Sequence, residues 1–503
     1  MRRALIAALL FATATPAWPQ AARPASPPAS VESLAPALDG PFRQFMEERH
    51  VPGLAWGIVQ NGRLVHLSTM GVQDLEQRRP VTGDSTFRIA SMSKVFTALA
   101  ILKLRDEGRL SLDALAETYV PELRNWSYPT TDSPRIRVRD LLSHTGGLVT
   151  DNPWGDLQQD LPEADFTRIL AEGVPMSRAP GTAFEYSNFG YALLGRIVTN
   201  VSGRPYAEYI EQEIMRPLGM ASTRYEVADS PRERRALGYR WENDAHSLER
   251  DMAHGAFGAM GGVETSANDY ARWLAFLASA WPARDGPEEG PVRRATVREL
   301  AQGLNFARTS ERPGLDGAPA CRFAVAYGMG LSAAQDCDLG LLLSHSGGYP
   351  GYGSYMMVLP DSGTALFAFA NRTYAAPIPT LTRTALELRR AGFIRSRVEP
   401  VTPALAEAYA GAGAAWRMGN LGPVENRLAM NFLPDRSAEN WAREFARLSG
   451  EVGACATDAP ITATGAMSGT FEWRCERGIL QGYLLLAPTN PPSIQELRLR
   501  VAP

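Results

Sequence analysis

Residues 87–97 of the chain read Phe87-Arg88-Ile89-Ala90-Ser91-Met92-Ser93-Lys94-Val95-Phe96-Thr97. This stretch predicts a short strand or turn that runs into a helix. The helix is expected to begin near Ser91 and to end near Gly108, because glycine suits a helix C-terminus. Ser91 and Lys94 are three residues apart, so both side chains project from the same face of the first turn. The sequence therefore predicts a hydroxyl beside an amine at the positive end of a helix.

This pair of side chains suits nucleophilic chemistry. A serine hydroxyl is a poor nucleophile without a base beside it, and Lys94 can be that base if burial or another cation disfavours its charge. The first-turn backbone N–H groups can also help to hold an oxyanion. A Ser three residues before a Lys is common by chance, and in that alternative Ser91 only caps the helix and Lys94 is solvated. Two further stretches of the chain bear on this choice.

The composition is that of an ordinary globular protein. Of 503 residues, 45% are hydrophobic and 21% are charged, and the formal net charge is −3. A chain of this length can hold two domains or more. The charge balance gives no argument for nucleic acid or an anionic membrane surface as a partner, so none is expected.

The first residues are typical of a cleaved export signal. Arg2 and Arg3 precede a short apolar run that ends at Ala12, and small residues follow. The run is too short to span a bilayer. We therefore expect a signal peptide at 1–21, a Pro/Ala-rich linker at 22–34, and a periplasmic or secreted protein without a membrane span after cleavage.

Four cysteines fall into two local pairs, Cys321 with Cys337 and Cys455 with Cys475. In an exported chain, two disulfides are the natural interpretation. Each would stabilise the fold by about 3 kcal/mol in the chain-entropy description. Free buried thiols are the alternative. A metal site is less favoured, because the sequence contains no Cys-x-x-Cys and no His-Glu-x-x-His motif.

Strands that precede and follow the Ser91 helix in the sequence are predicted to form one antiparallel sheet. Apolar runs at 54–60 and 63–67 flank Asn61-Gly62, which is a strong hairpin signal, and a third strand is expected to reach Val72. Further strands are predicted at 341–349, 356–359 and 365–370. Both ends of one domain would thus build one sheet, with a helical cluster between residues 91 and 280.

The second informative stretch is Tyr186-Ser187-Asn188, which we expect to be extended and to precede a helix over 192–201. Two residues apart in an extended segment, Tyr186 and Asn188 would point the same way. A phenol near a lysine ammonium has its anionic form favoured, so Tyr186 could transfer protons. Asn188 could hold Lys94 or a substrate amide.

The third informative stretch is an apolar strand that ends in His345-Ser346-Gly347-Gly348. A glycine-rich loop over 256–263 is also expected at the cleft, where its glycines permit a close approach of backbone to a ligand or merely tight turns. Another histidine, His144, lies in a glycine-containing loop over 143–148. For His144 we expect only a loop-orienting hydrogen bond, because nothing near it in sequence offers a catalytic partner.

Together, the three stretches resemble the serine beta-lactamase and penicillin-binding-protein superfamily, in particular its class C-like branch of D-alanyl-D-alanine carboxypeptidases, D-aminopeptidases and esterases. Ser91-Met92-Ser93-Lys94 looks like Ser-x-x-Lys, Tyr186-Ser187-Asn188 like Tyr-x-Asn, and His345-Ser346-Gly347 stands where the family has Lys-Thr-Gly or His-x-Gly. The resemblance covers a domain over 35–395. It implies an α+β fold, with an antiparallel sheet flanked by helices and an inserted all-helical cluster.

The resemblance also implies catalytic roles. Ser91 would be the acylated nucleophile, with Lys94 and Tyr186 sharing the proton transfer. Which of these two is the acylation base stays open, because coupled groups titrate together. The backbone N–H groups of Ser91 and Gly348 would form the oxyanion hole. No metal and no organic cofactor is implied.

The remaining residues of the motifs would bind or orient the substrate, and these are Asn188, His345, Ser346 and Gly347. His345 stands where typical class C beta-lactamases have Lys. A neutral imidazole captures a carboxylate less well than an ammonium does. We therefore expect a hydrolase of small-molecule esters or D-amino-acid peptides rather than an efficient beta-lactamase. The alternative is a weak or inactive module that binds peptidoglycan fragments or a protein. The sequence does not determine the oligomeric state.

Residues 400–503 lie outside the resemblance. They predict helices over 405–410 and 437–448, followed by strands over 470–475, 479–487 and 494–501. This order indicates a small accessory α+β domain with one disulfide, and it suits a nuclear-transport-factor-2-like cone. No set of catalytic residues is apparent in it.

Overall fold

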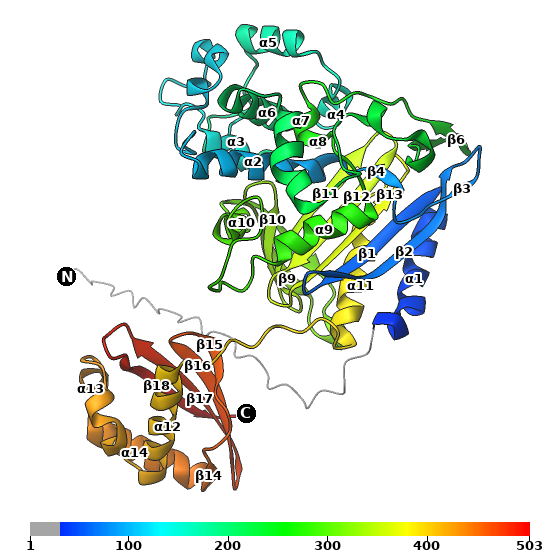
Figure 1. Cartoon of the computed structure of the whole chain (residues 1–503). Coiled ribbons are helices and arrows are strands. Elements are labelled where there is room, and N and C mark those ends of the chain that lie inside the picture. Colours follow the sequence, from blue (N-terminus) through cyan, green and yellow to red (C-terminus); the bar gives the residue numbers. More distant parts are fainter. Residues whose placement is uncertain (1–30, 503) are drawn as a thin grey trace, which may run out of the picture. The chain divides into compact units, whose positions relative to one another are not determined.

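The computed structural model describes residues 31–502, which separate into two compact units, one up to Arg395 and one from Ser396 (Figure 1). The expected signal peptide at 1–21 and residues 22–30 of the expected linker lie outside this range. Within residues 31–502, none of the helices combines the length and the apolar character needed to cross a membrane.

The first unit is built on an antiparallel sheet with nine strands among the described residues, in the order β3-β2-β1-β13-β12-β11-β10-β9-β8. The strands are β1 (Gly53–Gln60), β2 (Arg63–Asp74), β3 (Arg79–Pro80), β8 (Asn305–Arg312), β9 (Cys321–Tyr327), β10 (Ser332–Asp336), β11 (Gly340–Tyr349), β12 (Tyr352–Leu359) and β13 (Thr364–Ala370). Leu54 of β1 lies opposite Ala370 of β13. Both ends of the unit therefore meet in one sheet, as predicted.

The β1–β2 hairpin follows from its turn residues. Asn61 has φ of 48° and Gly62 has φ of 78°, as a two-residue turn with two positive φ angles requires. The prediction of a separate third strand ending near Val72 is wrong. Gly71, at φ 70°, bends β2 without ending it, and the strand continues to Asp74.

Helices cover both faces of the sheet (Figure 1). On one face, α1 (Val31–Glu48) and α11 (Ile378–Arg390) bury Phe42 and Leu381 with Trp56 of β1. On the other face lie α9 (Ala267–Ala278) and the predicted helical cluster. The cluster contains α2 (Lys94–Asp106), α3 (Val138–Leu142), α4 (Trp154–Leu157), α5 (Glu163–Glu172), α6 (Asn188–Ser202), α7 (Tyr206–Ile210) and α8 (Gly258–Gly261). Helix α10 (Arg294–Leu300) follows α9. The predicted α+β class is confirmed.

Helix α2 is buried on nearly all sides, which marks it as the central helix of the unit. Its first turn differs from the prediction, since Ala90–Ser93 form a 3-10 turn and the α-helix begins at Lys94. The expected end is confirmed. The helix stops at Asp106, and Gly108 follows with φ of 73°.

Helix α6 begins four residues earlier than expected, at Asn188, so the prediction that Tyr186 and Asn188 share an extended segment is wrong. The Ser187 hydroxyl accepts a hydrogen bond from the Gly190 N–H at 3.2 Å. The Asp151 carboxylate accepts from the Asn188 N–H at 2.7 Å. These bonds satisfy first-turn N–H groups that would otherwise be unpaired, so they allow the helix to start there.

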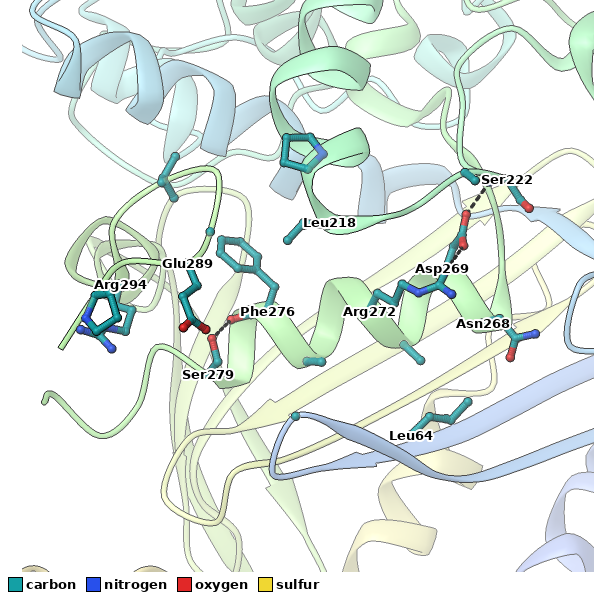
Figure 2. Close-up of a pocket in the computed structure, with 18 of the residues that line it drawn as sticks. Leu64, Leu218, Ser222, Asn268, Asp269, Arg272, Phe276, Ser279, Glu289 and Arg294 are labelled. Carbon is teal, nitrogen blue, oxygen red and sulfur yellow. Dashed lines mark hydrogen bonds and ion pairs between the residues drawn. The ribbon is translucent and has the colours of Figure 1, made fainter. Parts of the chain in front are cut away.

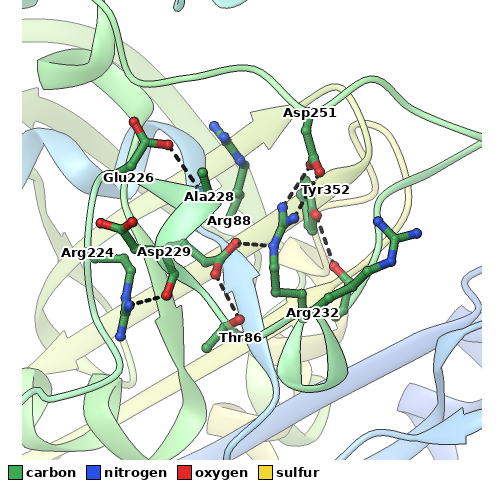
Figure 3. Close-up of polar contacts among 12 residues, drawn as sticks. Thr86, Arg88, Arg224, Glu226, Ala228, Asp229, Arg232, Asp251 and Tyr352 are labelled. Atoms are coloured by element: carbon green, nitrogen blue, oxygen red, sulfur yellow. Dashed lines mark hydrogen bonds and ion pairs between the residues drawn. The ribbon is translucent and has the colours of Figure 1, made fainter.

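A buried ion network holds the strand that leads into the Ser91 turn (Figure 3). Strand β4 (Thr86–Arg88) pairs with β7 (Glu264–Ser266). The fully buried Glu264 carboxylate accepts from Thr86 Oγ1 at 2.9 Å and from Arg235 Nε at 3.1 Å. Arg235 also donates two bonds of 2.8 Å to Asp251. Because each of these three charges has a partner, the network leaves none of them uncompensated while it connects β4 to Arg235 and Asp251.

The second unit has its own core. A sheet of β14 (Cys455–Ala456), β16 (Ser468–Cys475), β17 (Gly478–Ala487) and β18 (Ser493–Val501), with β15 (Thr462–Gly465) on β16, packs against α12 (Pro403–Met418) and α14 (Ala438–Val452). A short helix, α13 (Phe432–Asp435), precedes α14. The expected helices and strands are present, although both helices are longer than predicted. A nuclear-transport-factor-2-like fold stays a prediction.

Both expected disulfides are present. Cys321 pairs with Cys337 in the first unit, with an S–S distance of 2.01 Å. Cys455 pairs with Cys475 in the second unit, where the two residues face each other across β14 and β16.

Candidate active site

A cavity of about 630 Å³ opens where the helical cluster meets the sheet. It is lined by residues from all three predicted motifs, namely Ser91, Tyr186, His345, Ser346 and Gly348. Lys94 and Asn188 are fully buried and lie behind this lining. The structure therefore brings together side chains that are up to about 250 positions apart in the sequence, at a size that suits a small ligand.

The turn that carries Ser91 lies tightly against β11. Ala90 has φ of 50°, an unfavourable value for a residue with a Cβ. The Ile89 carbonyl accepts a hydrogen bond from Ser354 Oγ at 2.9 Å. A Cβ at Gly347 would collide with that same carbonyl and with Ser354 Oγ. Gly347 thus serves the close approach of β11 to the turn, and it is not part of the cavity lining.

The Lys94 ammonium has three oxygen partners. Its Nζ lies 3.0 Å from Ser91 Oγ, 2.7 Å from Asn188 Oδ1 and 2.8 Å from the Met260 carbonyl oxygen. The amide and carbonyl oxygens can only accept hydrogen bonds. A neutral amine would therefore direct its two hydrogens to them, which leaves its lone pair facing the Ser91 hydroxyl.

Burial makes that neutral form accessible. It lowers the pKa of Lys94 to about 7, although Asp156 and Asp151 oppose the shift by favouring the charged form. Close to neutral pH, a substantial fraction of Lys94 is then unprotonated. The Lys94–Ser91 pair can act as base and nucleophile without any large rearrangement.

Tyr186 contacts both members of this pair. Its hydroxyl is hydrogen-bonded to Ser91, and Lys94 Nζ lies 4.9 Å from its ring centroid. Burial raises the pKa of Tyr186 well above its ordinary value, and the bond to Ser91 only partly opposes this. Tyr186 is therefore a neutral phenol at neutral pH. It can relay a proton between neighbours but holds no anionic charge at rest.

His345 is a neutral imidazole with both nitrogens occupied. Its Nδ1 lies 2.7 Å from the Ser346 carbonyl oxygen, so Nδ1 carries the hydrogen and donates it. Its Nε2 then accepts from the Tyr327 hydroxyl at 3.0 Å. Burial, with a further contribution from Lys94, lowers the pKa of His345 to about 3. This side chain brings no positive charge to the cavity at neutral pH.

Two carboxyl groups beside the site were not found from the sequence. Asp151 holds the start of α6, and Asp156 lines the cavity and accepts a 3.1 Å hydrogen bond from Tyr374. Burial raises the pKa of Asp156 to about 6, while Lys94 and the Tyr374 bond oppose the rise. Asp151 lies in the loop before α4 and Asp156 lies in α4, and this segment contains no recognised motif. Only their proximity in the fold connects them with Lys94.

The expectation for His144 agrees with the structure. His144 Nδ1 accepts a hydrogen bond of 3.1 Å from the Ser187 N–H, which orients the loop before α6. The imidazole also packs against Tyr186, with ring centroids 4.3 Å apart. Burial lowers the pKa of His144 well below its ordinary value, so the ring is neutral.

A second cavity of about 730 Å³ lies beside α9, away from these residues (Figure 2). Leu218, Asp269, Arg272 and Phe276 line it. Arg272 donates to Asp269 at 2.7 Å, so these opposite charges are already paired. This cavity lacks a nucleophile beside a base of lowered pKa. The Ser91 cavity is therefore the candidate active site.

The model of the Beta-lactamase family matches residues 38–390, which is most of the first unit. The chain belongs to the Beta-lactamase family. The resemblance to the serine beta-lactamase and penicillin-binding-protein superfamily is thereby confirmed. The match ends before the second unit begins.

Two relatives illustrate the similarity in sequence. The chain is 27% identical over 337 residues to protein flp of Staphylococcus aureus (strain N315), a match that covers 66% of this chain and 62% of flp. It is 32% identical over 212 residues to esterase EstB of Burkholderia gladioli, covering 40% of this chain and 54% of EstB. The matched part thus spans less than two thirds of the length of either relative.

Solved structures show the same fold. The octameric penicillin-binding protein homologue from Pyrococcus abyssi has a TM-score of 0.57 at 23% identity, over 90% of this chain and 91% of that chain. The class C beta lactamase from Rhodobacter sphaeroides has a TM-score of 0.54 at 23% identity, over 71% and 99%. EstCE1, a hydrolase with promiscuous acyltransferase activity, has a TM-score of 0.57 at 21% identity, over 72% and 98%.

Proposed function

We propose that the protein is an exported serine hydrolase that forms an acyl-enzyme on Ser91 and cleaves esters or D-amino-acid peptides in preference to beta-lactams. One observation carries this proposal. The buried Lys94 amine lies 3.0 Å from Ser91 Oγ. Its other two partners, Asn188 Oδ1 and the Met260 carbonyl oxygen, can only accept hydrogen bonds. The lone pair of the neutral amine is therefore free to take the Ser91 proton. A module that only binds has no need for this arrangement.

Acylation follows from that geometry. Neutral Lys94 takes the Ser91 proton as Oγ forms its bond to the substrate carbonyl carbon. The carbonyl oxygen becomes an oxyanion, which the Ser91 and Gly348 N–H groups would hold. When the C–O or C–N bond breaks, Tyr186 gives its hydroxyl proton to the leaving group and regains one from the Lys94 ammonium. We assign the base role to Lys94, because the pKa of Tyr186 is raised and not lowered.

Deacylation reverses the same proton path. A water molecule attacks the ester carbonyl on Ser91 and loses a proton to Tyr186, which passes its own proton to neutral Lys94. Collapse of the second oxyanion breaks the bond to Oγ, and Lys94 returns the proton to Ser91. Every proton is conserved through one cycle. Neither step draws on a metal or cofactor.

The preference for esters or D-peptides rests on His345. Its pKa of about 3 leaves it neutral at the position where class C beta-lactamases have a lysine by resemblance. Similarity to EstB, an esterase, and to EstCE1, a hydrolase with acyltransferase activity, supports hydrolysis of esters. The expected signal peptide and the two disulfides support export.

The test is intact-mass spectrometry and turnover with p-nitrophenyl acetate and butyrate, nitrocefin and a D-Ala-D-Ala peptide. Ester or peptide turnover is expected, with a fluorophosphonate adduct that Ser91→Ala abolishes. Lys94→Met should lower the acylation rate by at least 10²–10³-fold, the size of a lost base or oxyanion donor. Lys103→Met is the control and should retain activity, because Lys103 lies on the same helix, partly buried, and its ammonium pairs with Glu107 and not with Ser91.

Two outcomes would contradict the proposal. Fast nitrocefin hydrolysis would show that a neutral His345 does not prevent beta-lactamase chemistry, so the ranking of substrates would be wrong. No adduct and no turnover of any substrate would favour a binding module that retains the cavity.

A further inference from the structure

Tyr374 joins the two walls of the Ser91 cavity. Its hydroxyl donates a 3.1 Å hydrogen bond to Asp156 Oδ2, and both side chains line the cavity. Asp156 belongs to α4 of the helical cluster, whereas Tyr374 follows β13 of the sheet. This hydrogen bond therefore spans the cavity from the sheet to the helical cluster.

The backbone of Tyr374 is held in an unfavourable conformation. Its φ is 53°, a value that glycine adopts freely and a residue with a Cβ does not. Its N–H is shared between the carbonyl oxygens of Tyr349 at 3.4 Å and Tyr352 at 3.1 Å, beside the turn between β11 and β12. These bonds fix the backbone and thereby direct the side chain. A large side chain on a strained backbone that its surroundings hold in place points to a role for that side chain.

The ring of Tyr374 fills the space beside Gly348. A Cβ at Gly348 would lie 2.8 Å from Tyr374 Cδ1, which is too close for two carbon atoms. Glycine therefore leaves the room that the ring needs. The Gly348 N–H is one of the two proposed oxyanion donors, so the ring lies next to the place where the reacting carbonyl of an ester would be bound.

The proposed mechanism decides which part of the substrate faces Tyr374. The leaving group lies beside Tyr186, because it receives the Tyr186 proton. The Tyr186 and His345 ring centroids are 6.3 Å apart, and Gly348 lies three residues further along β11, about 10 Å away at roughly 3.3 Å per residue. The leaving group and the acyl group extend from the carbonyl carbon in opposite directions. The acyl group therefore extends toward Gly348, Tyr374 and Asp156.

We propose that Tyr374 is a gate at the acyl end of the cavity, that Asp156 keeps it closed, and that this gate sets the largest acyl group that reacts. A short acyl group reacts with the hydrogen bond between Tyr374 and Asp156 intact. A long acyl group must displace the Tyr374 side chain and break that bond. Tyr374 is then a residue that determines specificity, and Asp156 is the residue that positions it. The inference rests on the proposed hydrolase function, of which it names the acyl class.

The test compares two series of esters in the full-length protein. p-Nitrophenyl butyrate and octanoate vary the acyl group with one leaving group, whereas ethyl and octyl acetate vary the alcohol with one acyl group. In the unaltered protein, kcat/KM should fall from butyrate to octanoate. Tyr374→Gly should raise the octanoate-to-butyrate ratio of kcat/KM by about tenfold or more, a factor in the range by which pockets discriminate single methylene groups. The octyl-to-ethyl ratio of the alcohol series should not change.

Two further variants separate the hydrogen bond from the ring. Tyr374→Phe keeps the ring and removes the bond to Asp156, so it should raise the octanoate-to-butyrate ratio by a smaller factor. Leu157→Ala is the control and should leave the ratio unchanged, because Leu157 lies on α4 beside Asp156, is 53% exposed and is not among the residues that line the cavity. Glycine suits the positive φ at position 374, so Tyr374→Gly should remain folded, and its melting temperature checks this.

The outcomes distinguish the gate from the hydrolase function. An unchanged octanoate-to-butyrate ratio in Tyr374→Gly, or an equal change in the alcohol series, would overturn the gate. If Tyr374→Gly did not fold, a Tyr374→Phe ratio equal to that of the unaltered protein would overturn it. Equal kcat/KM for butyrate and octanoate in the unaltered protein would do the same. Absence of butyrate turnover would overturn the hydrolase function itself, and the gate with it.

Discussion

At the scale of single residues, the proposed mechanism makes the reaction rate depend on the charge state of Lys94. Its pKa of about 7 reflects burial opposed by Asp156 and Asp151. Only the neutral amine can accept the Ser91 proton. The rate of acylation, followed as kcat/KM, should therefore rise as pH increases through about 7 and level off above it.

Asp156→Asn should move this rise to lower pH. The carboxylate stabilises the Lys94 ammonium, so a neutral amide in its place lowers the pKa of Lys94 further. At pH 6, each unit of that shift would increase the neutral fraction of Lys94 by up to about tenfold. Measurement of kcat/KM for p-nitrophenyl butyrate between pH 5 and 9 checks this.

Asp165→Asn is the matched control, because the Asp165 carboxylate on α5 is about half-exposed and pairs with Arg168. Its pH profile should equal that of the unaltered protein. A profile of Asp156→Asn that coincides with both would contradict an electrostatic role of Asp156 toward Lys94.

At the scale of elements, the approach of β11 to the Ser91 turn depends on Gly347. Gly347→Ala would place a methyl group against the Ile89 carbonyl and Ser354 Oγ. The strand must then move away from Ser91, and a displacement near 1 Å can cost 10²-fold in rate. We expect a loss of ester turnover of about that size.

The control is Gly146→Ala, because a Cβ there would lie 3.4 Å from Leu141 Cδ2, its nearest neighbour. Activity and melting temperature should change little. If Gly347→Ala lowered the melting temperature as well, labelling of Ser91 by a fluorophosphonate at low temperature would separate a misplaced site from unfolding. Unchanged turnover in Gly347→Ala would refute the packing argument.

The two disulfides belong to different elements and should act separately. Cys321–Cys337 joins the start of β9 to the segment between β10 and β11. Strand β9 ends at Tyr327, whose hydroxyl is hydrogen-bonded to His345 in the cavity. Removing this disulfide with Cys321→Ala/Cys337→Ala should lower the free energy of unfolding of the first unit by about 3 kcal/mol and raise the KM for esters. Denaturant unfolding and steady-state kinetics measure both effects.

Cys455→Ala/Cys475→Ala provides the comparison, because this disulfide lies in the second unit. It should destabilise that unit by a similar amount and leave the KM unchanged. Equal effects of both pairs on KM would show that the second unit contributes to the site.

At the scale of the whole molecule, the two units have separate cores. Buried residues of the first unit end at Ile394, and those of the second begin at Leu405. A chain that ends at Arg395 should therefore fold and hydrolyse short esters within about threefold of the full chain. Circular dichroism and ester kinetics check this. A folded but inactive truncated chain would contradict an independent first unit.

Local sequence signals predicted part of the site well. The spacing of Ser91 and Lys94 predicted two side chains on one face, and their polar atoms lie 3.0 Å apart. Asn61-Gly62 predicted the first hairpin, and the cysteine spacing predicted both disulfides. These inferences succeeded because each depends on residues close in sequence, where backbone geometry restricts what can meet.

The start of α6 shows where such signals fail. The segment Tyr186-Ser187-Asn188 was expected to be extended, yet the helix begins at Asn188 because Asp151, 37 residues away, accepts N–H bonds of its first turn. A cap supplied from a distant loop leaves no local pattern. The hydrogen bond between the Tyr327 hydroxyl and His345 likewise leaves no local pattern in the sequence.

The sequence by itself determined that the Ser91 hydroxyl and the Lys94 amine lie side by side, that the sheet is antiparallel, and that the helices and strands divide into two groups along the chain. Only the tertiary structure decided the chemistry of the groups. Burial lowers the pKa of Lys94, keeps His345 neutral and raises the pKa of Tyr186, and the fold brings the Tyr374 hydroxyl to Asp156. The reason is physical: desolvation and charge pairing depend on everything that surrounds a group in space, and most of those neighbours are distant in sequence.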